Sequence, residues 1–183
     1  MQTQSVRLLN RQLTQNVFRV HIYAEGFCDG KTLSEDNLCK TVGIKIKRTD
    51  SVLKVNGIGL LIGESYDIPE NRYSPFFAAD DTDAENLAIY DNGDVAVSKK
   101  GNDIWIGVPC TNSEIMRKIF EMCGAHIYCR TGDPIIAGAG IVAINSANGG
   151  EREITLKNGK TVTVALSPFT TAVFNDKTGE RLL

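Results

Sequence analysis

Among the five cysteines, at 28, 39, 110, 123 and 129, Cys110 has the setting that best suits nucleophilic chemistry. It comes just before a predicted helix, whose dipole and free N–H groups can lower the pKa of a thiol. A nucleophile also needs a base and an orienting group, and no histidine is near Cys110 in the sequence. Cys28, in a glycine-bounded loop, is the second candidate. The alternative is reduced thiols packed in the fold, which the odd count and the absence of a C-x-x-C pair favour.

A second group that could do chemistry is the acidic stretch from Asp80 to Glu85. Its carboxylates could present oxygens to a hard cation, which makes Asp81, Asp83 and Glu85 candidate metal ligands. A calcium-binding loop has a glycine at a fixed position and more ligands, and this stretch has neither. A solvated loop is the alternative interpretation, and the sequence predicts no cofactor.

Aromatic residues gather in the stretch YDIPENRYSPFF, which begins at Tyr66. They could form a sugar-binding platform, for which the candidate residues are Tyr66, Tyr73, Phe76 and Phe77. The alternative is an aromatic-rich loop that packs on the core, because Tyr and Phe bury a large apolar area. An exposed aromatic cluster would favour carbohydrate binding.

The only two histidines, His21 and His126, lie in apolar segments that read as strands. A hydrogen-bonded structural histidine is more common in such a position than a catalytic base or a metal ligand. The sequence also has no Cys/His ligand set, Walker loop, nucleophile elbow or dinucleotide fingerprint. It therefore shows no catalytic constellation.

The elements around Cys110 predict an α/β unit. Residues 104–108 form an apolar run typical of a strand covered on both faces. Thr111 and Glu114 have the spacing of a capping box, and apolar residues then recur at helical intervals as far as Cys123. Gly124 suits the end of that helix, and residues 125–129 resume as a strand. A strand, a helix and a second strand are thus expected in succession.

Upstream of this unit the pattern alternates between helices and strands. An amphipathic helix is expected over Gln2 to Gln15, a strand over Val17 to Tyr23, and a short helix from Ser34 to Lys40 closed by Gly43. Further strands are expected at 44–47 and 52–62, the latter broken by a hairpin at Asn56-Gly57. From Leu87 onward short strands alternate with turns in a meander.

The tail changes character after Asp133. Four strand candidates, at 135–145, 153–157, 161–166 and 171–174, are separated by turn residues. The sequence therefore predicts two domains, an α/β domain at 1–133 with a partial flavodoxin-like sheet and an antiparallel, sandwich-like β tail at 134–183.

Composition limits the classes of partner. The chain has 183 residues, 42% of them hydrophobic, which is enough for a core. Its 20 basic and 22 acidic residues are interspersed, with a net charge of -2, and this argues against a nucleic-acid partner. No apolar run approaches the ~20 residues that span a bilayer, and the start of the chain lacks the apolar core of a signal peptide. We expect no membrane partner and a cytoplasmic location.

Several segments, taken in order, resemble the C-terminal half of large bacterial glycoside hydrolases of the β-galactosidase type that carry a trimerisation domain. The resembling segments, which cover most of the chain from Val17, are VHIYAEGFCDG, LSEDNLCKTVGI, FFAADDTDAENLAIYDNGDVAVSKKGNDIWIGVP, CGAHIYCRTGD and LSPFTTAVFNDKTGERL. In that family a TIM barrel is followed by a flavodoxin-like domain, related in fold to class I glutamine amidotransferases, and then by a small β domain.

The resemblance implies an accessory role. A (β/α)₈ barrel needs about 200 residues or more, and this chain has no room for one. The two carboxylates of glycoside hydrolysis belong to the barrel in that family, so none is assigned here. The resemblance implies a homo-oligomer or a glycosidase catalytic domain as partner, with carbohydrate contact as a further expectation. The alternative is a small amidotransferase-like or hydrolytic enzyme that uses Cys110 or Cys28 as its nucleophile.

Overall fold

The computed structural model describes residues 17–183, and the chain forms two compact units, Met1–Ile119 and Phe120–Leu183. The division falls inside helix α3 (Ser113–Met122), whereas the sequence places the domain boundary after Asp133. The helix expected over Gln2 to Gln15 lies outside the described residues.

The N-terminal unit is mostly β structure. Its strands are β1 (Arg19–Ile22), β2 (Ile46–Thr49), β3 (Lys54–Gly57), β4 (Ser65–Asp67), β5 (Phe76–Ala79), β6 (Glu85–Tyr90), β7 (Val95–Lys100) and β8 (Asp103–Ile106). Helix α2 (Glu35–Val42) connects β1 to β2, and the 3-10 helix η1 (Gly59–Leu61) connects β3 to β4. Helix α3 begins after β8.

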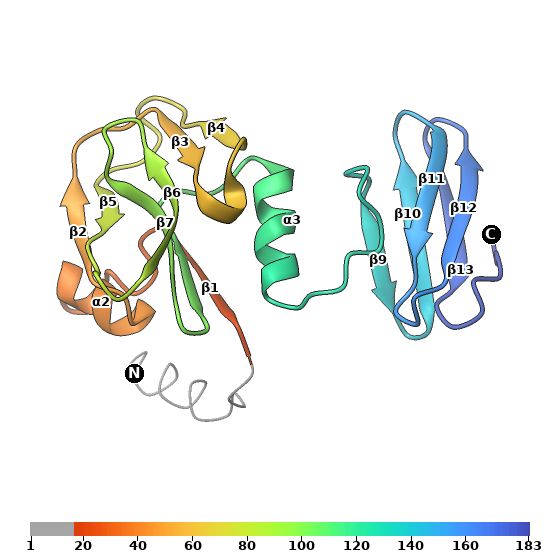
Figure 1. The fold of residues 1–183 in the computed structure, drawn as a ribbon, viewed down its shortest axis with the longest axis horizontal. Coiled ribbons are helices and arrows are strands. Elements are labelled where there is room, and N and C mark those ends of the chain that lie inside the picture. Colours follow the sequence, from red (N-terminus) through yellow and green to blue (C-terminus); the bar gives the residue numbers. More distant parts are fainter. Residues whose placement is uncertain (1–16) are drawn as a thin grey trace. The chain divides into compact units, whose positions relative to one another are not determined.

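These strands form one curled, mixed sheet (Figure 1). The order along the sheet is β1-β8-β7-β6-β3-β4, and β5 joins β7 to β2. Only β1 and β8 pair in parallel among the described strands, with His21 beside Trp105. Val95 of β7 lies opposite both Ala79 of β5 and Ile89 of β6, so the sheet branches at this residue.

The predicted flavodoxin-like α/β sheet is therefore wrong. Such a sheet has parallel strands connected by crossover helices, whereas β6, β7 and β8 follow one another as antiparallel neighbours. Their connections turn at Gly93 (φ 91) and Gly101 (φ 59), a left-handed conformation that favours glycine. The apolar run of β8 is buried although β8 pairs in parallel with β1 on one side and antiparallel with β7 on the other, so a buried apolar run does not identify an all-parallel sheet.

The predicted short helix after Ser34 is confirmed as α2. The Ser34 hydroxyl accepts a hydrogen bond from the Asn37 N–H, and Gly43 ends the helix with φ 78. A serine cap and a left-handed glycine satisfy backbone groups that the helix itself leaves unpaired. Leu38 and Val42 face the core of the unit, where they join a cluster of buried residues that also contains Ile44, Ile46, Phe77, Ala79 and Trp105.

The C-terminal unit is a small antiparallel sandwich. One sheet has the order β13-β10-β9, from β13 (Thr170–Asn175), β10 (Ile141–Ser146) and β9 (Ile135–Gly138). The other pairs β11 (Gly150–Thr155) with β12 (Thr161–Leu166). All described strand pairs of this unit are antiparallel, as the sequence predicts for the tail.

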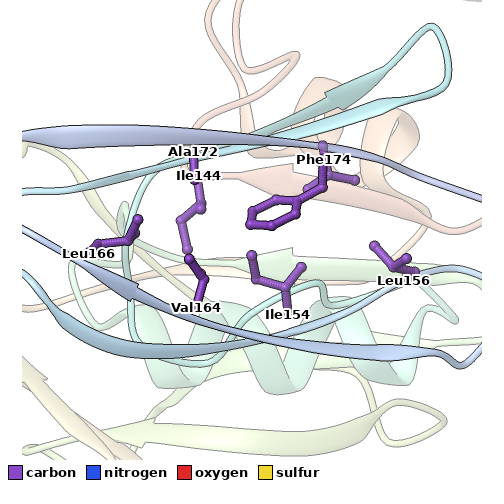
Figure 2. Close-up of a cluster of buried hydrophobic side chains, with 8 residues drawn as sticks. Ile144, Ile154, Leu156, Val164, Leu166, Ala172 and Phe174 are labelled. Atoms are coloured by element: carbon purple, nitrogen blue, oxygen red, sulfur yellow. The ribbon is translucent and has the colours of Figure 1, made fainter. Parts of the chain in front are cut away.

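The core of this unit lies between its two sheets. Figure 2 shows the side chains of Ile144, Ala172 and Phe174 pointing toward those of Ile154 and Val164. All five are nearly inaccessible to solvent, and the cluster is completed by Val142, Leu156 and Leu166. Alternate residues along each strand supply this core, as the period of two requires for a sheet with one buried face.

Three local predictions are wrong. Residues 125–129 form no strand, although the Tyr128 carbonyl accepts a hydrogen bond from Thr155 of β11 at 2.8 Å. No two-residue hairpin forms at Asn56-Gly57, because β3 continues to Gly57 and η1 follows. Gly57 is needed for close approach of the backbone, since a Cβ at this position would lie 2.1 Å from the Leu61 carbonyl oxygen. The expected strand 52–62 therefore ends there.

The third wrong prediction concerns the N-terminal cap of α3. The predicted capping box made Thr111 the N-cap, but the Asn112 side chain has this role. Its Oδ1 accepts the N–H groups of Glu114 at 2.8 Å and Ile115 at 3.2 Å. Its Nδ2 donates to the Ser65 carbonyl at 3.0 Å, so tertiary contact selects the capping residue.

Candidate functional site

Cys110 lies between β8 and α3, where its thiol donates to the Asn112 carbonyl at 3.4 Å. The nearby Tyr66 hydroxyl is buried and donates to the Val108 carbonyl at 3.2 Å. Burial raises the pKa of the Cys110 thiol above its ordinary value, and burial also raises the pKa of Tyr66. This environment favours the neutral thiol rather than the nucleophilic thiolate.

The histidines that could act as a base are engaged elsewhere. His21 contacts the carboxylates of Glu25 at 2.9 Å and Asp103 at 3.3 Å, and His126 lies 2.7 Å from the Thr155 carbonyl. Cys28 is exposed on a loop, and no disulfide joins any of the five cysteines, all of which lie within residues 17–183. The structure thus shows neither candidate cysteine hydrogen-bonded to a histidine.

The acidic stretch is divided among different partners. Asp81 is buried and accepts hydrogen bonds from Lys100 Nζ at 2.8 Å and from the N–H groups of Lys45 and Asp83. The hydrogen bond from Lys100 is the main cause that lowers the pKa of Asp81 to about 2. Glu85 instead faces Lys99 at 3.9 Å. Within residues 17–183 no three His, Cys, Asp or Glu side chains gather as metal ligands would.

The four aromatic candidates do not share one exposed platform. Phe77 is fully buried and Tyr66 nearly so, while Tyr73 packs on Tyr23 with ring centroids 5.4 Å apart. Phe76 lines an open hollow of 240 Å³ together with Ser51, Val52, Leu53, Glu70 and Asn71. This volume is below the about 300 Å³ at which typical ligand pockets begin.

Sequence reasoning missed the ionic cluster at the junction of β1 and β8. Arg19 binds both carboxylate oxygens of Asp103, at 2.5 and 2.6 Å, and His21 bridges Asp103 to Glu25. A neutral imidazole donates through only one of its two nitrogens, so only a protonated His21 can donate to both carboxylates. Because Arg19 and Asp103 are 84 residues apart, no local pattern connects them.

A second missed cluster holds the start of the C-terminal sandwich. Arg152 of β11 forms an ion pair with Asp133 and donates to the buried Ser146 hydroxyl at 2.7 Å. The hydrogen bond from Arg152 lowers the pKa of the Asp133 carboxyl. All of these groups satisfy one another, which is the pattern of a structural ion pair.

The outward face of the β13-β10-β9 sheet carries a row of apolar side chains. Ile136 of β9 lies opposite Ala143 of β10, which lies opposite Val173 of β13. Leu182 continues the row, because its N–H donates to the Val173 carbonyl at 2.7 Å next to the bridge between Phe174 and Arg181. Directly opposed residues project from the same face of a sheet. We call Ile136, Ala143, Val173 and Leu182 the apolar row.

The apolar row is open to solvent at both ends. Ile136 is 76% exposed and Leu182 is 53% exposed, and Ile141 on the same face is 40% exposed. A sheet face that only meets water normally carries polar residues, and an apolar surface there is typical of an interaction site. The signal in the sequence was the doublet Ile135-Ile136, of which one member had to face outward.

Comparisons leave the family open. No protein-family model matches the chain, and no curated protein matches it. No helix within residues 17–183 is long and apolar enough to cross a membrane. The fold itself defines a two-unit, β-rich protein whose C-terminal unit presents an apolar sheet face.

Proposed function

We propose that the chain is a non-catalytic association module of a glycoside hydrolase of the β-galactosidase type, and that it forms oligomers through the apolar row. The observation that carries the proposal is the exposure of Ile136 and Leu182 on one face of a regular sheet. Covering such a side chain completely stabilises a complex by about 1.5–3 kcal/mol before the costs of association.

The state of the polar groups supports a non-catalytic role. Cys110 is held as a neutral thiol, and the carboxylate of Asp81 is bound to Lys100. A catalytic group has to be available to a substrate and poised near the working pH. The buried Asp81 carboxylate, with a pKa of about 2, and the half-buried Cys110 thiol, with its raised pKa, meet neither condition.

The assignment to glycoside hydrolases rests on the resembling segments and their order. In the structure these segments include β1, the strands β5 to β8 and the strand β13, so the resemblance extends to both units. The catalytic carboxylates would belong to a separate barrel domain of the complete protein or to a partner chain.

Light scattering with a matched pair of variants tests the association. We expect the chain to show a mass above the 20.0 kDa of one copy, rising with concentration. Leu182→Ser removes an apolar side chain from the row and should weaken association by about tenfold. Phe169→Ser is the control, because Phe169 is 84% exposed but lies in the turn before β13.

Two results would count against the proposal. One is a mass of 20.0 kDa at every concentration. The other is an equal effect of the two variants, which would show that general surface hydrophobicity, and no particular face, causes the association.

A further inference from the structure

The strand β9 is an open edge of its sheet. It pairs with β10 on one side and ends the order β13-β10-β9, so no described strand pairs with its other side. The opposite edge of the same sheet is occupied, because residues 180–183 hydrogen-bond to Val173 and Asn175 of β13. An open edge presents unpaired N–H and C=O groups to any strand that can reach it.

The edge lacks several of the usual protections. Natural edge strands are blunted by short length, charged side chains, proline, bulges or covering segments. β9 is short, with four residues that follow Pro134. β9 has the sequence IIAG with no charged residue, and it ends in a tight turn at Ala139 (φ 50) and Gly140 (φ 81). By contrast, β11 carries Glu151, Arg152 and Glu153.

The hydrogen-bond register shows which backbone groups are free. The Asn145 N–H donates to the Pro134 carbonyl at 3.1 Å, so these two residues are a hydrogen-bonded pair. Pairs alternate in an antiparallel ladder, so Ile136 and Ala143 are also hydrogen-bonded, and Ile135 and Ala137 turn their N–H and C=O groups to the open side.

We infer that two copies of this chain associate by antiparallel pairing of their β9 edges about a two-fold axis centred on Ile136. In this register Ile135 of one copy faces Ala137 of the other, and each such pair exchanges two hydrogen bonds. Ile136 meets its equivalent at a non-hydrogen-bonded position, where Cα atoms approach to about 4.5 Å. The inference rests on the proposed function, for which it names a second copy as the partner, and it adds a contact through the β9 edge to the contact through the face of the apolar row.

The pairing would make the apolar row continuous across both copies. The row runs from Leu182 to Ile136 in one copy, and the two-fold axis places Ile136 of the second copy next to it. The same axis covers Ala137, which is exposed on the inner side of the edge. A second copy suits this edge because an uncharged strand is compatible with itself in an isologous contact.

Charge swapping at position 136 tests the register, with the oligomer measured by native mass spectrometry on the full chain. Ile136→Lys and Ile136→Glu each oppose like charges across the axis and should weaken the dimer by about a hundredfold. Mixing the two variants should restore a dimer that contains one copy of each. Because Ile136 is 76% exposed, both variants should keep the wild-type circular dichroism and melting temperature.

Two further variants separate pairing at β9 from a general effect of added charge. Thr163→Lys is the matched control, since Thr163 is exposed on the equally uncharged strand β12, opposite Glu153, and this change should leave the dimer intact. Ala137→Pro removes a donor from the open side without breaking a bond to β10, and it should abolish the dimer.

The outcomes separate this inference from the proposed function. A dimer that survives both Ile136→Lys and Ala137→Pro, or a wild-type trimer, would overturn the edge pairing and leave an association module. If Thr163→Lys disrupted the dimer as strongly as Ile136→Lys, the contact would involve β12, and this result would also overturn the pairing of β9 edges. A wild-type chain that is monomeric at all concentrations would overturn both the edge pairing and the proposed function.

Discussion

The Asp81 carboxylate lies 2.8 Å from the Lys100 ammonium group, although the Asp81 side chain is only 1% exposed. Two backbone N–H groups also donate to it, so its charge is fully compensated. The residue that the sequence offered as a metal ligand therefore stabilises the strand-to-loop junction after β5.

Asp81 should make the stability of the N-terminal unit depend on pH. Its pKa in the folded state, about 2, is below the ordinary value, so its contribution is present above about pH 4 and is lost as the pH falls toward 2. We expect Asp81→Asn to cost about 2 kcal/mol at neutral pH and progressively less in acid. Urea unfolding of both proteins between neutral and acidic pH measures this difference.

The control for that measurement is Asp83→Asn. The Asp83 side chain is 78% exposed, and its carboxylate lies 3.8 Å from Lys100 Nζ, which is farther than the 2.8 Å between Asp81 and Lys100. It should change the free energy of unfolding by less than about 0.5 kcal/mol. A difference between wild type and Asp81→Asn that stays constant with pH would contradict the assigned role.

Replacing the cap of α3 should distinguish Asn112 from its neighbour. Asn112→Ala removes the acceptor of two helix N–H groups and the donor to the Ser65 carbonyl, so we expect a loss of about 1–2 kcal/mol. Thr111→Ala should cost little. Denaturant unfolding of the two variants checks this, and a larger effect at Thr111 would restore the predicted capping box.

Thiol labelling should rank the two candidate cysteines. Cys28 is exposed, whereas Cys110 is partly buried and burial raises its pKa. We expect iodoacetamide to modify Cys28 faster than Cys110 in the native chain near neutral pH, with sites identified by peptide mass spectrometry. Faster labelling of Cys110 than of a model thiol would reopen the hydrolytic alternative.

The elements that the sequence predicted well have strong local signals. Ser34 and Gly43 bracket α2 because a cap and a left-handed glycine act within one helix. The meander of β6, β7 and β8 follows from turn residues such as Gly93 and Gly101. Each of these signals involves residues only a few positions apart.

The fold class failed because it depends on long-range pairing. Nothing near Arg19 indicates that β1 will lie beside β8, and a buried strand in a curled, mixed sheet has the same apolar run as a strand of an all-parallel sheet. Likewise, Asn112 replaces Thr111 as cap through its bond to Ser65, 47 residues away.

The apolar row could not be predicted from the sequence for the same reason, because it depends on the register between strands. Ile136, Ala143, Val173 and Leu182 are spread over the tail, and only the pairing of β9, β10 and β13 brings them into one row. The cysteine, acidic and aromatic candidates were found from residue type, which does not show whether a group is already satisfied by its neighbours.

Amide hydrogen exchange at Ile135 and Ala137 tests the central claim most directly. At low concentration both N–H groups should exchange freely, and at high concentration both should slow by about tenfold or more as β9 edges pair. The Ile136 amide, already bonded to Ala143, is the internal reference and should change much less. Rates at Ile135 and Ala137 that do not depend on concentration, in a chain that nevertheless oligomerises, would contradict association through β9.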